Sequence, residues 1–397
     1  MKLARWEPSK LSASASAHLD AIRAVASSAV MWGHLRTLFF VNFRHLQHPG
    51  WALKTVYFLT GFGHQAVMVF FVLSGFLISS TVIKSHLSGS WSWREYAINR
   101  SSRLYVVLIP GLLLGLFWDL AGSSLFAPTG IYMHPVSDLG AAIPAHNLTV
   151  GTLFGNLFFL QTIFCPTFGS NGPLWSLANE FWYYALFPVV LSAALAWAKR
   201  YMRVAIPSTA LAFSLIFFLG LDKFMGFLIW MAGCILVFAY SRLRLRSNPW
   251  KAVYVVGSSL ALCGTLVEAR TSNSAVLGSD LAVGIAFTLF LFGILQLEVG
   301  ANGAHYSGAA HRFAGFSYSL YVLHFPLLLF LRSWVVSPER WKPSGIKMFY
   351  ATLIGLGVLS FAWLISLFTE HRTHEARRLL QRVLGRWNTE SPRSTHK

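Results

Sequence analysis

The stretch MFYATLIGLGVLSFAWLISLF, residues 348–368, decides the fold class, because it carries no charged side chain. A membrane-spanning helix needs about 20 mostly apolar residues, and comparable runs occupy residues 204–220 and 281–297. Of the 397 residues, 55% are hydrophobic and only 12% are charged, which is about half the charged fraction of an ordinary soluble domain. The sequence therefore excludes a typical soluble protein and predicts an all-α, polytopic transmembrane bundle.

Apolar runs of this kind predict about ten spanning helices and one additional short segment. The spans are expected to start near Leu19, Val67, Leu104, Phe181, Val204, Phe224, Lys251, Leu281, Phe313 and Met348. The additional segment, residues 151–164, is expected to be re-entrant or interfacial. If it crossed the membrane, the basic cluster at 199–203 would fall outside the cell, against the positive-inside rule.

The net charge of +18 is explained by topology rather than by a nucleic-acid partner, because Lys and Arg occur in short clusters between apolar runs. Placing both termini in the cytoplasm puts most of these clusters inside, although the basic loops 36–54 and 332–347 then lie outside. We expect a cytoplasmic segment at 1–18, a transmembrane domain at 19–370 and a basic cytoplasmic tail at 371–397.

Cysteine and histidine patterns give no metal or disulfide signature. The three cysteines are widely separated and mostly lie in apolar runs, so they are expected to be packing residues. His371 and His374 lie near Glu370 and Glu375 at a basic helix end without further ligands nearby, so a metal site is not predicted.

The first apolar helix, LDAIRAVASSAVMWGH at 19–34, carries ionisable residues, which are costly in membranes and indicate function by default. Arg23 and His34 are eleven residues apart, so they share one helix face about 16 Å apart along the axis. Asp20 lies on the same stripe. One interpretation is an interfacial Asp20–Arg23 ion pair with His34 as a satisfied polar residue. The other is a polar path with Arg23 at its cytoplasmic mouth and His34 as a general base.

The second helix contains VMVFFVLSGFLISS from residue 67, which favours close helix packing over chemistry because Ser74 and Gly75 are small. The segment RSSRLY at 100–105 then brings Arg100 and Arg103 onto neighbouring faces of one helical turn. They are either a topological anchor or an anion site, since arginine side chains suit phosphate.

Two later segments supply further candidates. The stretch GSNGPLWSLANE at 169–180 mixes turn formers with Trp175 and Glu180, which indicates irregular backbone lining a cavity. Glu180 has the alternative role of a carboxylate favoured by a helix N-terminus. The helix at 316–326 places Tyr321 and His324 on one face, and this polar edge could also pack against neighbouring helices.

Taken in order, these segments resemble the membrane-bound acyltransferase family 3. The Arg-x10-His element of the family's opening helix falls on Arg23 and His34, and FFVLSGFLIS at 70–79 is similar to its second helix. RSSRLY, WSLANEFWYY at 175–184 and SYSLYVLHFP at 317–326 resemble later motifs. Four positions depart from the family pattern: Ala21, Ala24, Met68 and Arg372. Met68 stands where an acidic residue is frequent.

The resemblance implies a bacterial inner-membrane enzyme that moves an acetyl or similar acyl group from cytoplasmic acyl-CoA to a hydroxyl of an envelope or exported glycan, with no bound cofactor. We expect His34, Arg23 and Asp20 to be catalytic residues and Arg100 and Arg103 to bind the acyl donor. The acceptor-side candidates are Trp175, Glu180, Tyr321 and His324. A transporter or flippase is the rival, because polar stripes in a helix bundle also suit a permeation path.

Overall fold

The structure is a computed structural model that describes residues 11–126, 131–132, 144–245, 247–271, 276–298, 304–336 and 339–389. Within these residues the chain is helical, and its only β-type contacts are isolated bridges between Phe40 and Trp341 and between Gln161 and Cys165. The predicted all-α class is therefore confirmed for the described part of the chain.

The helices follow one another in chain order. Their bounds are α1 Ala13–Phe39, α2 Trp51–Leu59, α3 Gly63–Leu87, α4 Trp93–Phe126, α5 Val150–Leu157, α6 Leu174–Ala198, α7 Met202–Arg242, α8 Asn248–Thr271, α9 Val276–Ile294, α10 Ala304–Ala314, α11 Ser317–Val335, α12 Gly345–Ser366 and α13 Thr373–Thr389. The start of α1 is capped by Ser12, whose hydroxyl accepts a hydrogen bond from the amide of Ala15 at 3.1 Å.

Seven helical stretches of the described residues are long and apolar enough to cross a membrane. They are Trp51–Leu87, Trp93–Phe126, Leu174–Ala198, Met202–Arg242, Asn248–Thr271, Ser317–Val335 and Gly345–Val383. The chain is thus a multi-pass membrane protein, but the expected count of about ten spans is not established. The polar stripe of α1 lowers its hydropathy, and the apolar part of α9, Gly278–Ile294, is shorter.

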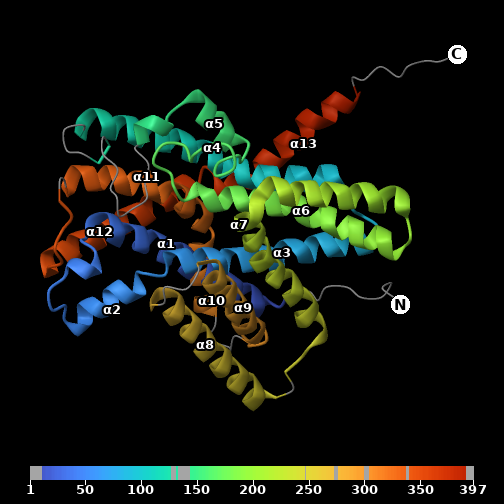
Figure 1. Cartoon of the computed structure of the whole chain (residues 1–397), viewed down its shortest axis with the longest axis horizontal. Coiled ribbons are helices and arrows are strands. Elements are labelled where there is room, and N and C mark those ends of the chain that lie inside the picture. Colours follow the sequence, from blue (N-terminus) through green and yellow to red (C-terminus); the bar gives the residue numbers. More distant parts are fainter. Residues whose placement is uncertain are drawn as a thin grey trace.

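Two details bear on the individual spans that the sequence predicts. Gly220, with φ 78° and ψ 169°, breaks α7 into two arms that run in different directions (Figure 1). The segment expected to be re-entrant, residues 151–164, overlaps one short helix, the eight-residue α5. A helix of that length covers about 12 Å, far less than the bilayer core of about 30 Å.

Helix α3 runs through the middle of the bundle, where it packs against α1, α6, α7 and α9 (Figure 1). Helix α11 packs against α1, α4 and α12, so α1 lies between the two groups. Helix α8 contacts mainly α9, and its large apolar side chains are exposed, which suits a lipid-facing position.

Helices α3 and α7 come together at backbone distance. A Cβ atom built on Gly75 would lie 1.9 Å from the carbonyl oxygen of Trp230, and one on Gly233 would lie 2.1 Å from that of Val72. Small residues permit such approach, and lipid offers no comparable packing. The expectation that Ser74 and Gly75 serve packing agrees with this crossing.

We expect Gly75→Ala to destabilise the protein by at least about 1 kcal/mol, because the added methyl group forces the two helices apart. Gly257→Ala is the matched control, since no atom lies within 4 Å of the corresponding position on α8. Thermal unfolding of both variants in one detergent tests this expectation. Equal unfolding midpoints would show that the crossing tolerates a side chain.

The orientation of the bundle can be tested with single cysteines in a background lacking Cys165, Cys234 and Cys263. Gln47 lies in the exposed loop after α1, and Ser90 lies in the exposed turn between α3 and α4. With both termini in the cytoplasm, an impermeant thiol reagent should label Gln47→Cys in intact cells and Ser90→Cys only after permeabilisation. The reverse pattern would invert the predicted topology.

Candidate functional site

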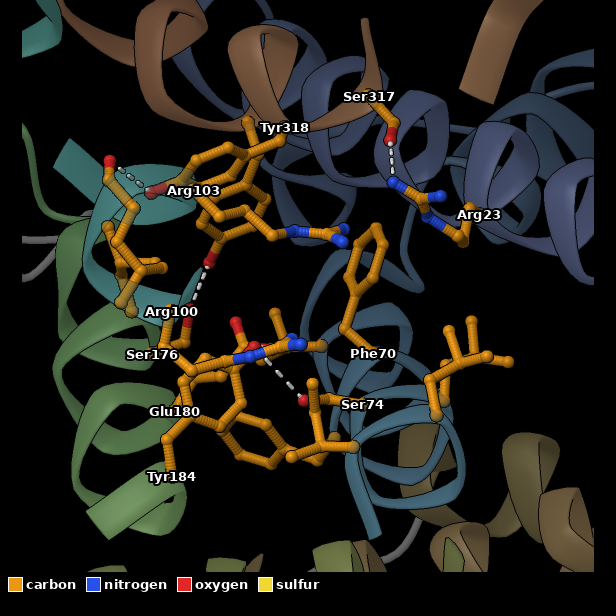
Figure 2. Close-up of a pocket in the computed structure, with 18 of the residues that line it drawn as sticks. Arg23, Phe70, Ser74, Arg100, Arg103, Ser176, Glu180, Tyr184, Ser317 and Tyr318 are labelled. Carbon is orange, nitrogen blue, oxygen red and sulfur yellow. Dashed lines mark hydrogen bonds between the residues drawn. The ribbon is translucent and has the colours of Figure 1, made fainter. Parts of the chain in front are cut away.

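The first candidate site is a cavity of about 290 Å³ among α1, α3, α4, α6 and α11. We call it the arginine cavity, because Arg23, Arg100 and Arg103 line it together with Glu180 (Figure 2). The cavity is also lined by Val67, Phe70, Ser74, Ser176, Tyr184, Ser317, Tyr318 and Tyr321. Residues from five helices thus converge on one space inside the bundle, which has both charged and apolar walls.

The arginines of this cavity are held mainly by neutral groups. The Nη2 of Arg23 donates to the hydroxyl of Ser317 at 3.3 Å, and its Nη1 lies 3.7 Å from a carboxylate oxygen of Asp20. The guanidinium carbon of Arg100 lies 5.8 Å from the ring centre of Tyr96 and 5.9 Å from that of Tyr184.

Within the described residues, neither Arg100 nor Arg103 forms an ion pair with a carboxylate. The cavity therefore contains three cations and one carboxylate, Glu180, and offers a favourable environment to an anionic ligand.

Glu180 is oriented by a chain of hydrogen bonds that begins in the bundle core. The indole nitrogen of Trp230 donates to the hydroxyl of Ser74 at 3.2 Å, which donates to that of Tyr184 at 3.3 Å. Tyr184 in turn donates to a carboxylate oxygen of Glu180 (Figure 2). Because Trp230 and Ser74 lie at the α3–α7 crossing, the contact between these helices also fixes the carboxylate in the cavity.

The second candidate site is a cavity of about 480 Å³ lined by α1, α3, α11, the start of α6 and the irregular segment before it. We call it the histidine cavity, because His34 and His64 line it. Trp175, Asn147 and Ser170 add an aromatic ring and polar groups. Its mixture of aromatic rings with several hydrogen-bonding groups suits a polar organic ligand.

The hydrogen bonds of His34 define which of its nitrogens is free. The Nδ1 of His324 lies 2.9 Å from the carbonyl oxygen of Leu320, which can only accept, so this nitrogen carries the proton. The Nε2 of a neutral His324 is then an acceptor, and the Nδ1 of His34, 2.8 Å away, donates to it. The Nε2 of a neutral His34 therefore keeps its lone pair, as a general base requires.

Ring contacts hold His34 in this orientation. Its ring plane lies within 12° of the plane of His324, with centres 5.1 Å apart. The ring of Phe325 packs edge-on at 5.0 Å. His324 is fully buried and serves as the hydrogen-bond partner of His34.

The two cavities meet at Val67 and Tyr321, which line both. The hydroxyl of Tyr321 lies 2.6 Å from that of Ser176 and donates to the carbonyl oxygen of Pro173 at 3.1 Å. The ring of Phe70 packs edge-on against Tyr321, with centres 6.0 Å apart. These contacts fix the Tyr321 ring between the two cavities.

The structure distributes the candidate residues between the cavities. Arg23, Arg100, Arg103, Glu180 and Tyr321 line the arginine cavity, whereas His34, Trp175 and Tyr321 line the histidine cavity. Glu180, expected on the acceptor side from the sequence, therefore lies with the donor candidates.

Two other candidates line neither cavity. His324 bonds to His34, and Asp20 contacts Arg23 and the Nδ1 of His311 at 3.2 Å.

Several residues of these sites were not singled out from the sequence. His64 reaches the histidine cavity from the first turn of α3, and its Nε2 lies 2.8 Å from a carboxylate oxygen of Asp280. Asp280 lies in α9, within an otherwise apolar run, and this position could have identified it as a functional candidate. Within the described residues, no three His, Cys, Asp or Glu side chains gather so as to hold a metal ion.

The structure thus defines a multi-pass membrane protein whose helical bundle contains an arginine-lined cavity next to a histidine-lined cavity. A family model described as an acyltransferase domain matches residues 16–367. The chain therefore belongs to the membrane-bound acyltransferase family 3, as the motifs indicated.

Curated relatives include "Putative O-acetyltransferase SACOL0978" and "Putative O-acetyltransferase SAS0844", from Staphylococcus aureus strains COL and MSSA476. Each is 26% identical over 347 residues, covering 81% of this chain and 52% of the relative. The chain thus spans about half the length of these relatives. No solved structure matches it.

Proposed function

We propose that the protein is an O-acyltransferase of the bacterial inner membrane. It transfers an acetyl or similar acyl group from cytoplasmic acyl-CoA to a hydroxyl of an envelope or exported glycan. The observation that carries this proposal is the contact between two cavities. One contains Arg100 and Arg103, which pair with no carboxylate of the described residues, and the other contains a histidine Nε2 free to accept a proton. Family membership supports the same chemistry.

The arginine cavity is the proposed donor site. Its volume of about 290 Å³ is at the lower end of the range for small-molecule sites, about 300–1,000 Å³. Only the narrow acyl-bearing arm of acyl-CoA fits such a space, so its nucleotide remains at the mouth. Arg100 and Arg103 are suited to bind phosphate there, because no carboxylate of the described residues pairs with them.

The proposed reaction takes place at the boundary formed by Val67 and Tyr321. The acceptor oxygen attacks the thioester carbonyl carbon while the Nε2 of His34 takes the hydroxyl proton. The carbon–sulfur bond then breaks, and the proton passes from His34 to the departing thiolate of CoA. The products are the ester and free CoA, and His34 returns to its neutral form.

The histidine cavity is the proposed acceptor site. Trp175 offers an apolar face to a sugar ring, and Asn147 and Ser170 offer hydrogen-bonding groups to its hydroxyls. His34 lines the same cavity, so an acceptor hydroxyl bound there can approach its Nε2.

Release of CoA separates this proposal from the transporter alternative. Purified protein incubated with labelled acetyl-CoA and an envelope glycan fraction should release CoA and transfer the label to the glycan. A transporter or flippase would do neither. Absence of both products under conditions where the protein remains folded would overturn the proposed function.

Replacement of the base gives the first functional prediction. His34→Ala should lower kcat at least about 100-fold, the usual minimum contribution of general acid–base catalysis. Arg23→Ala should also abolish glycan acylation. His18→Ala is a matched control, since His18 lies on the same helix, bonds to Tyr306 and lines neither cavity. If His34→Ala kept a tenth of the activity, His34 would not be the base.

The second functional prediction concerns donor binding. Arg100→Ala and Arg103→Ala should each raise the KM for acetyl-CoA by about 10- to 100-fold, because hydrogen bonds to charged groups contribute about 1.5–3 kcal/mol each. Lys at either position should restore binding only in part. Arg94→Ala is the control, since exposed Arg94 on α4 lines neither cavity. An unchanged donor KM in both Ala variants would remove these arginines from the site.

The third functional prediction concerns acyl-chain length. Val67 lines both cavities, so we expect its side chain to limit acyl length at the boundary. The wild type should then prefer acetyl-CoA to butyryl-CoA, and Val67→Ala should reduce that preference by about tenfold or more. Val72→Ala is the control, as Val72 is buried in the same helix but lines neither cavity. The ratio of kcat/KM values for the two donors is the measurement. A ratio unaffected by Val67→Ala would show that selectivity is set elsewhere.

A further inference from the structure

A third cavity of about 290 Å³ adjoins the histidine cavity and shares His64, Thr162 and Trp175 with it. We call it the aspartate cavity. Its other walls come from α3, α6, the second arm of α7 and α9, through Met68, Phe71, Asn179, Asp222, Lys223, Met225, Gly226, Ile229 and Asp280. None of the steps proposed above uses these residues, apart from Trp175.

The aspartate cavity gathers buried polar groups that are costly in a membrane bundle. Asp280, Lys223 and Asn179 are only 7%, 7% and 6% exposed. Within the described part of the chain, the side-chain oxygen of Asn179 has no hydrogen-bond partner. An unpaired buried oxygen costs about 1–3 kcal/mol, which a ligand that donates a hydrogen bond would offset.

Helix cross-linking explains only part of this cluster. The bond between His64 and Asp280 joins α3 to α9 and has structural value. Lys223 differs, because its Nζ pairs at 2.9 Å with Asp222, the residue before it, whose side chain is 67% exposed. A pair between adjacent residues joins no two helices, so structural support does not account for a buried ammonium group.

The apolar walls complete the chemistry of a sugar site. The ring of Trp175 lies between the two cavities, with its centre 6.1 Å from that of His64 and 6.2 Å from that of Phe71. A pyranose has apolar ring faces and a rim of hydroxyls that both donate and accept. Carboxylate and amide oxygens at Asp280 and Asn179 can accept from such hydroxyls, and Lys223 can donate to them.

We propose that the aspartate cavity binds a second sugar unit of the acceptor, next to the unit whose hydroxyl meets His34. This inference rests on the proposed function and narrows its acceptor to an oligosaccharide or polymer. The shared wall of His64, Thr162 and Trp175 makes the two sugar sites contiguous, and the volume of the aspartate cavity suits one ring rather than a chain.

The test uses envelope glycan cut by mild acid and separated into monosaccharide and short oligosaccharide fractions, with labelled acetyl-CoA as donor. The wild type should acylate the oligosaccharide with a kcat/KM at least tenfold above that for the monosaccharide. Asp280→Asn and Lys223→Met should each reduce this ratio at least fivefold. Glu268→Gln is the matched control, since Glu268 is exposed on α8 and lines none of the three cavities.

The ratio compares two acceptors on the same enzyme sample, so loss of folded protein alone cannot change it. A wild-type ratio near one, or variants that keep the wild-type ratio, would overturn the second subsite while leaving acyl transfer established. A wild type that transfers no label to either fraction and releases no CoA would instead overturn the proposed function itself.

Discussion

The backbone contact between α3 and α7 is the constraint on which the rest of the bundle depends. Gly75 and Gly233 leave room for each other's helix, so α3 can occupy the centre with α1, α6 and α9 around it. From that position α3 contributes to the walls of all three cavities. The same crossing places Trp230 and Ser74 where their hydrogen bonds orient Tyr184 and Glu180.

The membrane environment explains why polar residues in this bundle form connected groups. Lipid offers no hydrogen bonds, so a polar side chain inside a helix bundle requires a protein partner, water or a ligand. Arg23 is hydrogen-bonded to Ser317, His34 to His324, and Tyr321 to Ser176. Arg100 contacts aromatic rings, and among the described residues neither Arg100 nor Arg103 pairs with a carboxylate. This arrangement is expected where an anionic ligand supplies the missing negative charge.

The sequence was sufficient for the fold class, because lipid imposes a strong length and apolarity signal. It was also sufficient to place Arg23 and His34 on one helix. The sequence could not show which cavity each side chain lines, since this depends on tertiary contacts between distant segments. Glu180 looked like an acceptor residue, yet α6 turns it toward the arginines. His324 proved to be the partner of His34 because α1 and α11 pack together.

The division into adjoining cavities has a consequence for competing hydrolysis. A cavity of about 480 Å³ beside His34 has room for water, and a base that activates a sugar hydroxyl can also activate water. On the proposed mechanism, the boundary at Val67 and Tyr321 admits only the small acyl end of the donor. Binding of a remote sugar unit in the aspartate cavity would supply free energy to displace water and align the reacting hydroxyl. Preference for a longer acceptor and protection of the thioester would then have the same physical origin.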